Sequence, residues 1–240
     1  MGRHGTIAGR KAAQDSKRAA MFTKYGRQII VAAKAGGDPE YNATLRVAIE
    51  KAKAIGMPND NIKRAIKKGT GELEGETYSE LSFEGYGVGG VAVIVEALTD
   101  NRNRTAGEVR HYFDKFGGNM GTPGCVGFMF EKKGVLIIER EDLEKDEDTV
   151  MEAALEAGAS DFEADEDIFT IYTEPEDLSA VRDDLAAQGY EFASAEVEQV
   201  PSTYTKIDDP DVQVQMQKML DMFEDNDDIQ NVWHNWEDAE

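Results

Sequence analysis

The chain has 240 residues, enough for one large domain or for two or three small ones. An apolar fraction of 40% can build hydrophobic cores, and a charged fraction of 31% suits a soluble protein. No apolar run approaches the roughly 18 residues of a membrane span, and the first residues lack the apolar stretch of a secretory signal. We therefore expect a cytoplasmic protein with no membrane partner.

The formal net charge of −22 hides a strong asymmetry along the chain. Residues 1–70 contain 15 Lys and Arg against five Asp and Glu, a net of +10, whereas residues 71–240 contain 11 against 43, a net of −32. Asymmetry on this scale indicates a partner such as nucleic acid or another polyanion. The basic part is where we expect function, and the acidic remainder leaves open a protein partner on the C-terminal domains.

Residues 1–75 are expected to form a basic helical domain. Residues 8–34 are Ala-rich and lack proline, which favours helix. After the break at GGDPEYN, apolar residues from Leu45 onward recur at helical spacing. A third helix over NDNIKRAIKK, capped by its Asn or Asp, should end at Gly69, and TGELEGET should be a linker.

The pattern changes to alternating strands and helices beyond this linker. VAVIVEALT and CVGFMFE indicate two strands, and NRTAGEVRHYFDKFG between them indicates a helix. Phe128 and Phe130 would share one face of the second strand. Because the RNP1 pattern of base-stacking sheets is absent, we expect both rings to be buried under helices.

The order β-α-β-β-α-β is expected over residues 132–200, which describes a complete ferredoxin-like domain. The tail from PSTYTKID to DIQNVWHNWE indicates one more β-α-β unit. We expect residues 76–131 and 201–240 to close into a second such domain, because each half alone would leave a sheet face uncovered. The predicted fold class is a multidomain α+β protein: an N-terminal helical bundle and two ferredoxin-like α+β domains, one inserted in the other.

The stretch GYGVGG at residues 85–90 has the spacing of a dinucleotide-binding fingerprint. That fingerprint requires its glycines after a strand and at the start of a helix, whose free N–H groups hold the pyrophosphate. Here the glycines precede the strand VAVIVEALT and no helix starts at Gly90. We expect a tight turn into a strand instead.

No catalytic constellation is evident, so we expect a protein that is not an enzyme and has no cofactor. His4, His111 and His234 lie far apart without metal-ligand spacing, which predicts no metal site. Cys125 is the single cysteine, which suits a reducing compartment, and we expect it to be a buried or half-buried filler.

The positive signal is the basic helices. On a helical wheel Arg10, Lys17 and Lys24 fall within about 40° of one another, and Lys11 and Arg18 lie beside them. In the third helix the cations form two i, i+4 pairs opposite an apolar stripe, Lys63 with Lys67 and Arg64 with Lys68. Like charges at that spacing destabilise a helix by a few tenths of a kcal/mol, and a bound polyanion would reverse this repulsion. These residues are the predicted nucleic-acid-binding site.

The stretch TDNRNRT adds two further candidates, Arg102 and Arg104, at a strand-to-helix junction. Asn103 or Thr105 could cap the helix. Cations near a helix N-terminus are unfavourable unless an anion lies close. Asp100 is the candidate partner within the chain, and a phosphate is the alternative.

Four segments of this chain resemble the YebC/PmpR family. They are RKAAQDSKRAAMFTK, MPNDNIKRAIKKGTGELEG, EGYGVGGVAVIVEALTDNRNRTAGEVRHYFDKFGGNMGTPGCVGFMFE and QNVWHNW. The likeness covers essentially the whole chain and implies a helical N-terminal domain with two α+β domains. Many members begin with a Gly-His-Ser-Lys-Trp-Ala type start, whereas this chain reads GRHGTIAG, so the family's tryptophan is missing there.

The resemblance implies a non-enzymatic cytoplasmic regulator of gene expression. Bacterial members are usually described as DNA-binding transcriptional regulators, whereas the mitochondrial relative is a translational activator and others are linked to ribosomes. The basic helices offer mainly Lys, Arg and Ala, which suits contact with phosphates more than readout of base edges. We therefore expect action on RNA or the ribosome, with DNA-binding transcription regulation as the alternative.

Overall fold

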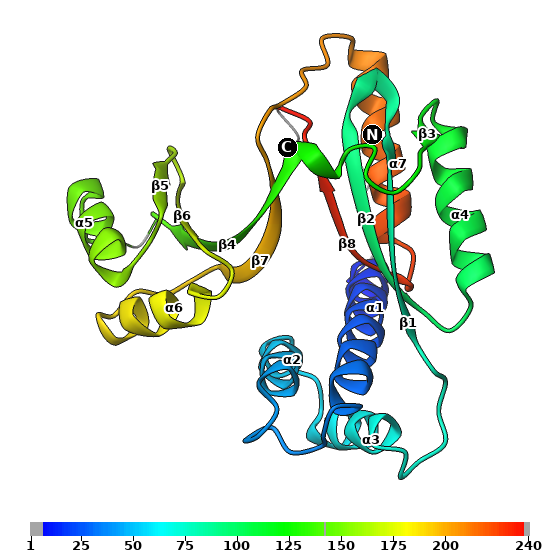
Figure 1. Ribbon diagram of the computed structural model, residues 1–240, viewed down its shortest axis with the longest axis horizontal. Helices are drawn as coiled ribbons and strands as arrows, with labels where there is room; N and C mark the ends of the chain where they lie inside the picture. Colours follow the sequence, from blue (N-terminus) through cyan, green and yellow to red (C-terminus); the bar gives the residue numbers. More distant parts are fainter. Residues whose placement is uncertain (1–6, 142, 238–240) are drawn as a thin grey trace. The chain divides into compact units, whose positions relative to one another are not determined.

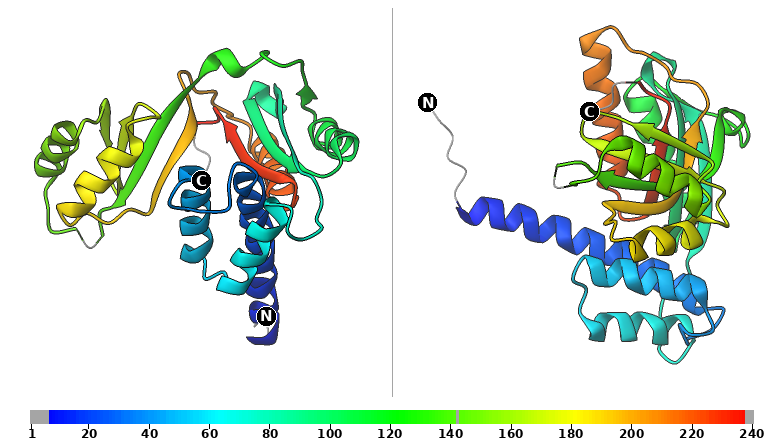
Figure 2. Two further views of the ribbon diagram at one scale, coloured as in Figure 1. Left: turned by 60° about the horizontal axis from the view of Figure 1, so that its bottom comes forward. Right: turned by 90° about the vertical axis from the view of Figure 1, so that its left-hand side faces the viewer.

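The structure is a computed structural model that describes residues 7–141 and 143–237, with only the backbone of residues 7–18. The chain divides into two compact units. The first unit holds Met1–Val126 and Thr205–Glu240, and the second unit holds Gly127–Tyr204. Each is described by itself below (Figures 1 and 2). The three domains expected from the sequence, with their boundaries, stay a prediction.

The N-terminal part of the first unit consists of three helices, in the positions that the apolar periodicity predicts. They are α1 (Ile7–Ala33), α2 (Ala43–Ala54) and α3 (Asn59–Gly69). Asn42 caps α2 by accepting a hydrogen bond from Leu45 N at 3.0 Å, and its amide donates to the carbonyl oxygens of Ala32, in the last turn of α1, and of Gly36, just after it. Ile29, Leu45 and Ile62 are among the residues of the shared core.

Helix α3 begins without a side-chain cap and ends at a glycine that packs closely against α1. The N-cap residue is Pro58, without a side-chain hydrogen bond, so the predicted capping by Asn or Asp is wrong. The chain enters the helix directly from proline, and Asp60 instead lies in the first turn, where it complements the helix dipole. At the other end, a Cβ on Gly69 would collide with the carbonyl oxygen of Ile30, so glycine is required where α3 meets α1.

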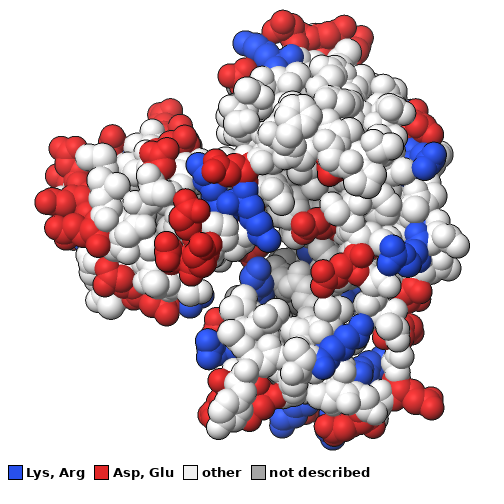
Figure 3. All heavy atoms as spheres, viewed as in Figure 1, with Lys and Arg blue, Asp and Glu red and all other residues white. Residues whose placement is uncertain are grey.

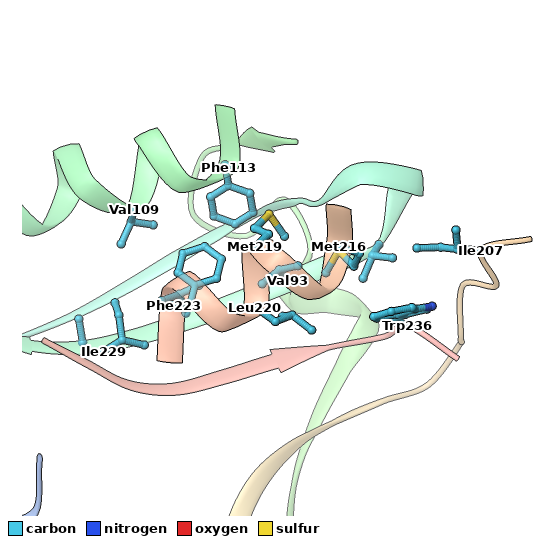
Figure 4. Close-up of a cluster of buried hydrophobic side chains, with 13 residues drawn as sticks. Val93, Val109, Phe113, Ile207, Met216, Met219, Leu220, Phe223, Ile229 and Trp236 are labelled. Carbon is cyan, nitrogen blue, oxygen red and sulfur yellow. The ribbon is translucent and has the colours of Figure 1, made fainter. Parts of the chain in front are cut away.

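The first unit also contains a four-stranded sheet with antiparallel neighbours in the order β3-β1-β2-β8. Its strands are β1 (Ser79–Tyr86), β2 (Ala92–Thr99), β3 (Asn119–Met120) and β8 (Ile229–His234). Helices α4 (Arg102–Lys115) and α7 (Pro210–Glu224) pack on one face. Figure 4 shows Phe113 of α4 and Phe223 of α7 pointing toward each other, with ring centroids 5.3 Å apart.

This sheet corrects the strands predicted for the two half-domains. Strand β1 was not predicted. Pro201 ends a strand of the second unit, and the rest of PSTYTKID forms only an isolated parallel bridge, between Thr205 and Trp236. CVGFMFE is not a strand of this sheet: the Glu84 carboxylate accepts from Gly124 N and Val126 N at 2.8 and 2.9 Å, which removes those donors from any ladder. A 3-10 turn, η2 (Gly127–Met129), follows.

The second unit follows the predicted order β-α-β-β-α-β. Its elements are β4 (Phe130–Glu139), α5 (Glu147–Ala157), β5 (Asp161–Ala164), β6 (Ile168–Thr173), α6 (Leu178–Ala187) and β7 (Ser194–Pro201). The sheet order β5-β6-β4-β7 with antiparallel neighbours is that of a ferredoxin-like domain. Both helices pack on one face, where Val150 and Leu185 join Leu136 in the core.

The first sheet has the same spatial pattern with a different connection. Strands β2 and β3 flank α4, as the first two strands of a ferredoxin-like domain flank a helix, and β8 follows α7. The place in the sheet that β6 occupies in the second unit is taken here by β1, which precedes β2 in the chain. The expected β-α-β halves are therefore replaced by a hairpin followed by two helix–strand units.

The GYGVGG stretch forms the turn of that hairpin, as expected. It contains the 3-10 turn η1 (Val88–Gly90), in which Gly89 and Gly90 have φ of 75° and 79°. Gly87 N donates to Val91 O at 2.7 Å and closes the turn. Positive φ explains these two glycines, and no helix begins there to hold a phosphate.

Candidate nucleic-acid interface

Helix α3 carries a row of cations on the side away from its core contacts. Ile62 and Ala65 are buried, whereas Lys63, Arg64 and Lys67 are exposed. Lys68 is half-buried, and its aliphatic stem lies beside Gly75. The amphipathic arrangement predicted for this helix is therefore present.

The α3 cations have no anionic partner in the described part of the chain. Among the residues that the structure describes, no ion pair involves Lys63, Arg64, Lys67 or Lys68. The two like-charge pairs destabilise the helix by a few tenths of a kcal/mol each. Lys67 and Lys68 lie in the last turn, where the helix dipole stabilises cations by about 0.3–1 kcal/mol, so the two effects nearly cancel. The row is left able to accept an external anion.

Helix α1 also carries predicted binding cations, but the structure describes the side chain of only one of them, Lys24. The helix spans the positions of Arg10, Lys11, Lys17 and Arg18, but their side chains lie outside the described residues, so their common face stays a prediction. The departure from the family's usual start also falls largely on undescribed residues. Lys24 is half-buried and lines a cavity of about 330 Å³ together with Met21, Asn226 and Gln230.

Helix α2 adds two exposed cations that were not singled out in the sequence. Arg46 and Lys53 are exposed, off the buried stripe of the helix. Their position between apolar residues in the basic segment was the available signal. Figure 3 shows Lys and Arg atoms over α2 and α3 at the bottom of the view, with acidic atoms between them.

One basic residue of the N-terminal part, Arg27, is largely buried and paired with a carboxylate of the same unit. The Arg27 side chain is only 13% exposed, and its Nη1 lies 2.5 Å from Asp228 Oδ1. The same atom donates to the carbonyl oxygens of Leu98 and Asp227 at 3.0 and 2.9 Å, and the guanidinium lies 5.1 Å from the ring centre of Tyr78. Arg27 therefore ties α1 to the sheet and is not available to a ligand.

Asp228 is the centre of this cluster. The residue is only 3% exposed, and its Oδ2 accepts from Thr105 Oγ1 at 2.7 Å and from Arg104 Nη2 at 2.8 Å. Burial raises the pKa of the Asp228 carboxyl, but hydrogen bonds from Arg104, Thr105 and Arg27 together with the charge of Arg27 outweigh it and hold the pKa at about 2.

The candidates Arg102 and Arg104 differ in their surroundings. Arg104 also pairs with Asp100 at 2.7 Å, the partner anticipated within the chain, and both carboxylates raise its pKa. The capping residue of α4 is Asn101, which accepts from Arg104 N at 3.1 Å, so the predicted cap at Asn103 or Thr105 is wrong. Thr105 is instead buried against Asp228. Arg102 is exposed and has no partner among the described residues.

Other candidate features turn out differently. Phe128 is 76% exposed in η2 rather than buried in a strand, which corrects the prediction, and Phe130 is half-buried at the start of β4. The turn η2 interrupts the predicted strand, so the two rings do not share one strand face. Cys125 is half-buried as expected, and burial together with the charge of Glu84 raises its pKa, which disfavours the reactive thiolate.

Within residues 7–141 and 143–237, no group of three or more His, Cys, Asp and Glu side chains is arranged to hold a metal ion. No helix in that part of the chain is long and apolar enough to cross a membrane.

The fold and its charged surface define a class: an α+β protein with a basic three-helix N-terminal part and two antiparallel four-stranded sheets. Two family models match this chain. The model described as "TACO1/YebC protein N-terminal domain" matches residues 3–72, and "TACO1/YebC second and third domain" matches residues 78–236. The chain belongs to the TACO1/YebC family, which confirms the resemblance of its motifs.

Similar proteins cover nearly the full chain. A protein of Clostridioides difficile is 58% identical over 99% of both chains, and one of Acetivibrio thermocellus is 56% identical over 96% of this chain and 95% of its own. Both are named "probable transcriptional regulatory protein". The crystal structure of the conserved hypothetical protein Aq1575 from Aquifex aeolicus matches with a TM-score of 0.84 and 45% identity, covering 93% of this chain and 91% of that one.

Proposed function

We propose that this protein is a non-enzymatic, cytoplasmic regulator of gene expression that binds nucleic acid through its basic N-terminal helices. The observation that carries the proposal is the row of α3 cations without an anionic partner in the described chain. Exposed Lys and Arg that neutralise phosphates release the counterions condensed on the nucleic acid, and this release favours binding. The names of the relatives support a role as regulator.

The target that we favour is RNA, on the ribosome during translation. The exposed positions of α3 are dominated by Lys63, Arg64 and Lys67, which suit contact with phosphates in any sequence. A DNA-binding transcriptional regulator is the second candidate. It is supported by the relatives' names and by the exposed amide of Asn61 beside these cations, since Asn can pair with an adenine edge in the major groove.

The α3 row is tested by reversing its three exposed charges, Lys63→Glu, Arg64→Glu and Lys67→Glu, in one variant. Lys68 is left in place because its stem packs beside Gly75. We expect affinity for labelled single-stranded RNA to fall on the order of a hundredfold at low salt, and the slope of log affinity against log salt to shrink by about 2. Fluorescence anisotropy over a salt series measures both, and the thermal midpoint should stay nearly unchanged.

The matched control carries the same change of charge elsewhere: Lys132→Glu, Lys206→Glu and Lys218→Glu, all exposed in the structure. It should bind almost as wild type does, because only the general charge of the protein has changed. Equal losses in both variants would show that net charge, rather than the α3 row, governs binding, and the proposal would fail.

Fractionation of gently lysed cells separates the two targets. Comigration with ribosomes that survives DNase and collapses with RNase supports action on translation. Heavy material that is sensitive to DNase, with no protein on ribosomes, supports the transcriptional regulator. In either case the triple α3 variant should leave the heavy fractions.

A further inference from the structure

Helix α4 is a basic element within a strongly acidic stretch of sequence. From residue 71 onward the chain has 11 Lys and Arg against 43 Asp and Glu, yet the 14 residues of α4 contain four basic residues, two acidic residues and His111. Figure 3 shows Lys and Arg atoms over α4 at the right-hand edge of the molecule. This local reversal of charge needs a physical explanation.

Helix α4 has one buried face and one exposed face. Thr105, Val109 and Phe113 are buried against the sheet. The opposite face exposes Asn103, Gly107, Arg110, His111 and Asp114. Arg102 is exposed at the N-terminal end of the helix, about 140° around the axis from Gly107.

Only some of the charged side chains of α4 are paired with other described residues. Arg104 is held by Asp100 and Asp228, and Glu108 accepts from the Asn226 amide at 2.9 Å. Among the described residues, none forms a hydrogen bond or ion pair with Arg102 or Arg110. Asp114 is exposed on the same face and does not pair with Arg110 in the described structure. Arg102 and Arg110 are therefore without a counter-ion among the described residues, although residues 71–240 are otherwise rich in carboxylates.

Gly107 lies in the middle of this exposed face without a structural reason to be glycine. A Cβ built there meets nothing within 4 Å, and the residue does not adopt a positive φ. Glycine inside a helix is less favourable than alanine because its unfolded chain has more freedom to lose. Gly69 of α3 is the contrast, since packing against Ile30 requires it. A glycine that the fold does not need, on the exposed face that also carries Arg110, indicates a place where another backbone approaches closely.

We propose that this face of α4 is a second binding site for nucleic acid, which takes the sugar–phosphate backbone of an RNA strand. Arg102 and Arg110 contact phosphates, and Gly107 lets the strand lie against the helix. Asn103 and His111 can each donate and accept hydrogen bonds, which matches the 2′-hydroxyl group that DNA lacks. The occupant is argued from charge, because a phosphate backbone is the complement of an unpaired arginine pair in an acidic surrounding. The inference rests on the proposed function and adds a second contact surface to it.

Two variants test this face by independent means. Arg102→Gln with Arg110→Gln removes charge, and Gly107→Leu places a side chain where the strand would lie. We expect each to weaken binding of labelled single-stranded RNA about tenfold, and the arginine variant to shrink the salt slope by about 1. The Gly107→Leu protein should melt at or above the wild-type temperature, because leucine favours helix and has open space there.

Matched controls are available on other exposed positions. Lys206→Gln with Lys218→Gln removes two exposed charges outside α4, and Ala180→Leu adds the same bulk on the surface of α6. Both controls should bind as wild type does. Wild-type affinity and slope in both α4 variants would overturn the inference. Equal weakening for duplex DNA and for RNA would overturn its assignment to RNA.

The outcome is separable from that of the proposed function. If the triple α3 variant loses binding while both α4 variants keep it, the α3 interface stands and the α4 site is wrong. If the α4 variants lose binding while the triple α3 variant keeps it, the α4 site stands and the α3 interface is wrong. A wild-type protein without affinity for RNA would overturn both.

Discussion

The two units use their charged residues in different ways. In the first unit the buried carboxylate of Asp228 pairs with both Arg27 and Arg104, and the α3 cations lie outside this cluster, with no ion-pair partner among the residues that the structure describes. The second unit has 23 Asp and Glu against five Lys and Arg, a net of −18, and none of its described carboxylates is buried. The same residue types therefore hold the structure together in one unit and cover the surface in the other.

This difference shows that net charge alone does not locate a binding surface. The N-terminal residues 1–70 carry a formal +10, but the charge of Arg27 is neutralised inside the protein. What a ligand meets is the set of charges that the fold leaves exposed and unpaired. In the second unit, exposed acids repel a polyanion, which would direct it to the basic helices of the first unit.

The largest expected effect comes from removing the centre of the cluster with Asp228→Ala. The change leaves the Arg27 guanidinium, only 13% exposed, without its counter-ion, and we expect a loss of about 3–5 kcal/mol of unfolding free energy. Urea unfolding followed by tryptophan fluorescence measures it. Both tryptophans, Trp233 and Trp236, lie in the first unit, so the signal reports on that unit.

The control for Asp228→Ala removes the other carboxylate that holds Arg104. Asp100 is 36% exposed, so Asp100→Ala should lower stability by no more than about 1 kcal/mol. Similar losses of unfolding free energy in the two variants would show that the buried carboxylate of Asp228 stabilises the cluster no more than the exposed carboxylate of Asp100 does.

The local sequence predicted the second unit almost completely, and it predicted the exposure of Lys63, Arg64 and Lys67 on α3. Each strand and helix from β4 to β7 comes from contiguous residues, and the period of its apolar positions changes visibly from two to 3.6. The exposed cations of α3 follow from the same reasoning, since one helix turn fixes which residues lie opposite Ile62. Patterns within a dozen residues suffice for such features.

The first unit was predicted less well because its sheet and its ion cluster join distant residues. Arg27, Arg104 and Asp228 come from three separate segments, and no local period marks them as partners. Strand β1 did carry a signal, because Leu81 and Phe83 alternate with polar residues in SELSFEGY. The apolar run of CVGFMFE favours a strand, but Glu84 holds the N–H of Val126 and that of the preceding Gly124, and the turn η2 delays the strand until Phe130.

A smaller effect is expected when the same cluster is titrated with acid. The pKa of Asp228 is lowered to about 2 in the folded protein, so its contribution is fully present above its ordinary pKa of about 3.9 and is lost as the pH falls through 2. We expect the stability difference between wild type and Asp228→Asn to shrink by roughly 2 kcal/mol from about pH 5 to pH 2. Urea unfolding followed by tryptophan fluorescence at a series of pH values checks this. A difference that stays constant over that range would contradict the assigned role of the carboxylate.

The smallest effect returns to the second unit, where a carboxylate acts only at the surface. Asp146 caps α5 by accepting from Thr149 N at 2.9 Å, and this hydrogen bond lowers its pKa. Asp146→Ala should destabilise the unit slightly through loss of this cap, seen as severalfold faster amide hydrogen exchange in α5, with the tryptophan transition of the first unit unchanged. Asp148→Ala, in the first turn of the same helix, removes only a favourable charge near the helix dipole and should cost a few tenths of a kcal/mol. If the tryptophan transition moved with Asp146→Ala, the two units would unfold together, and their difference in charge would not correspond to separate stabilities.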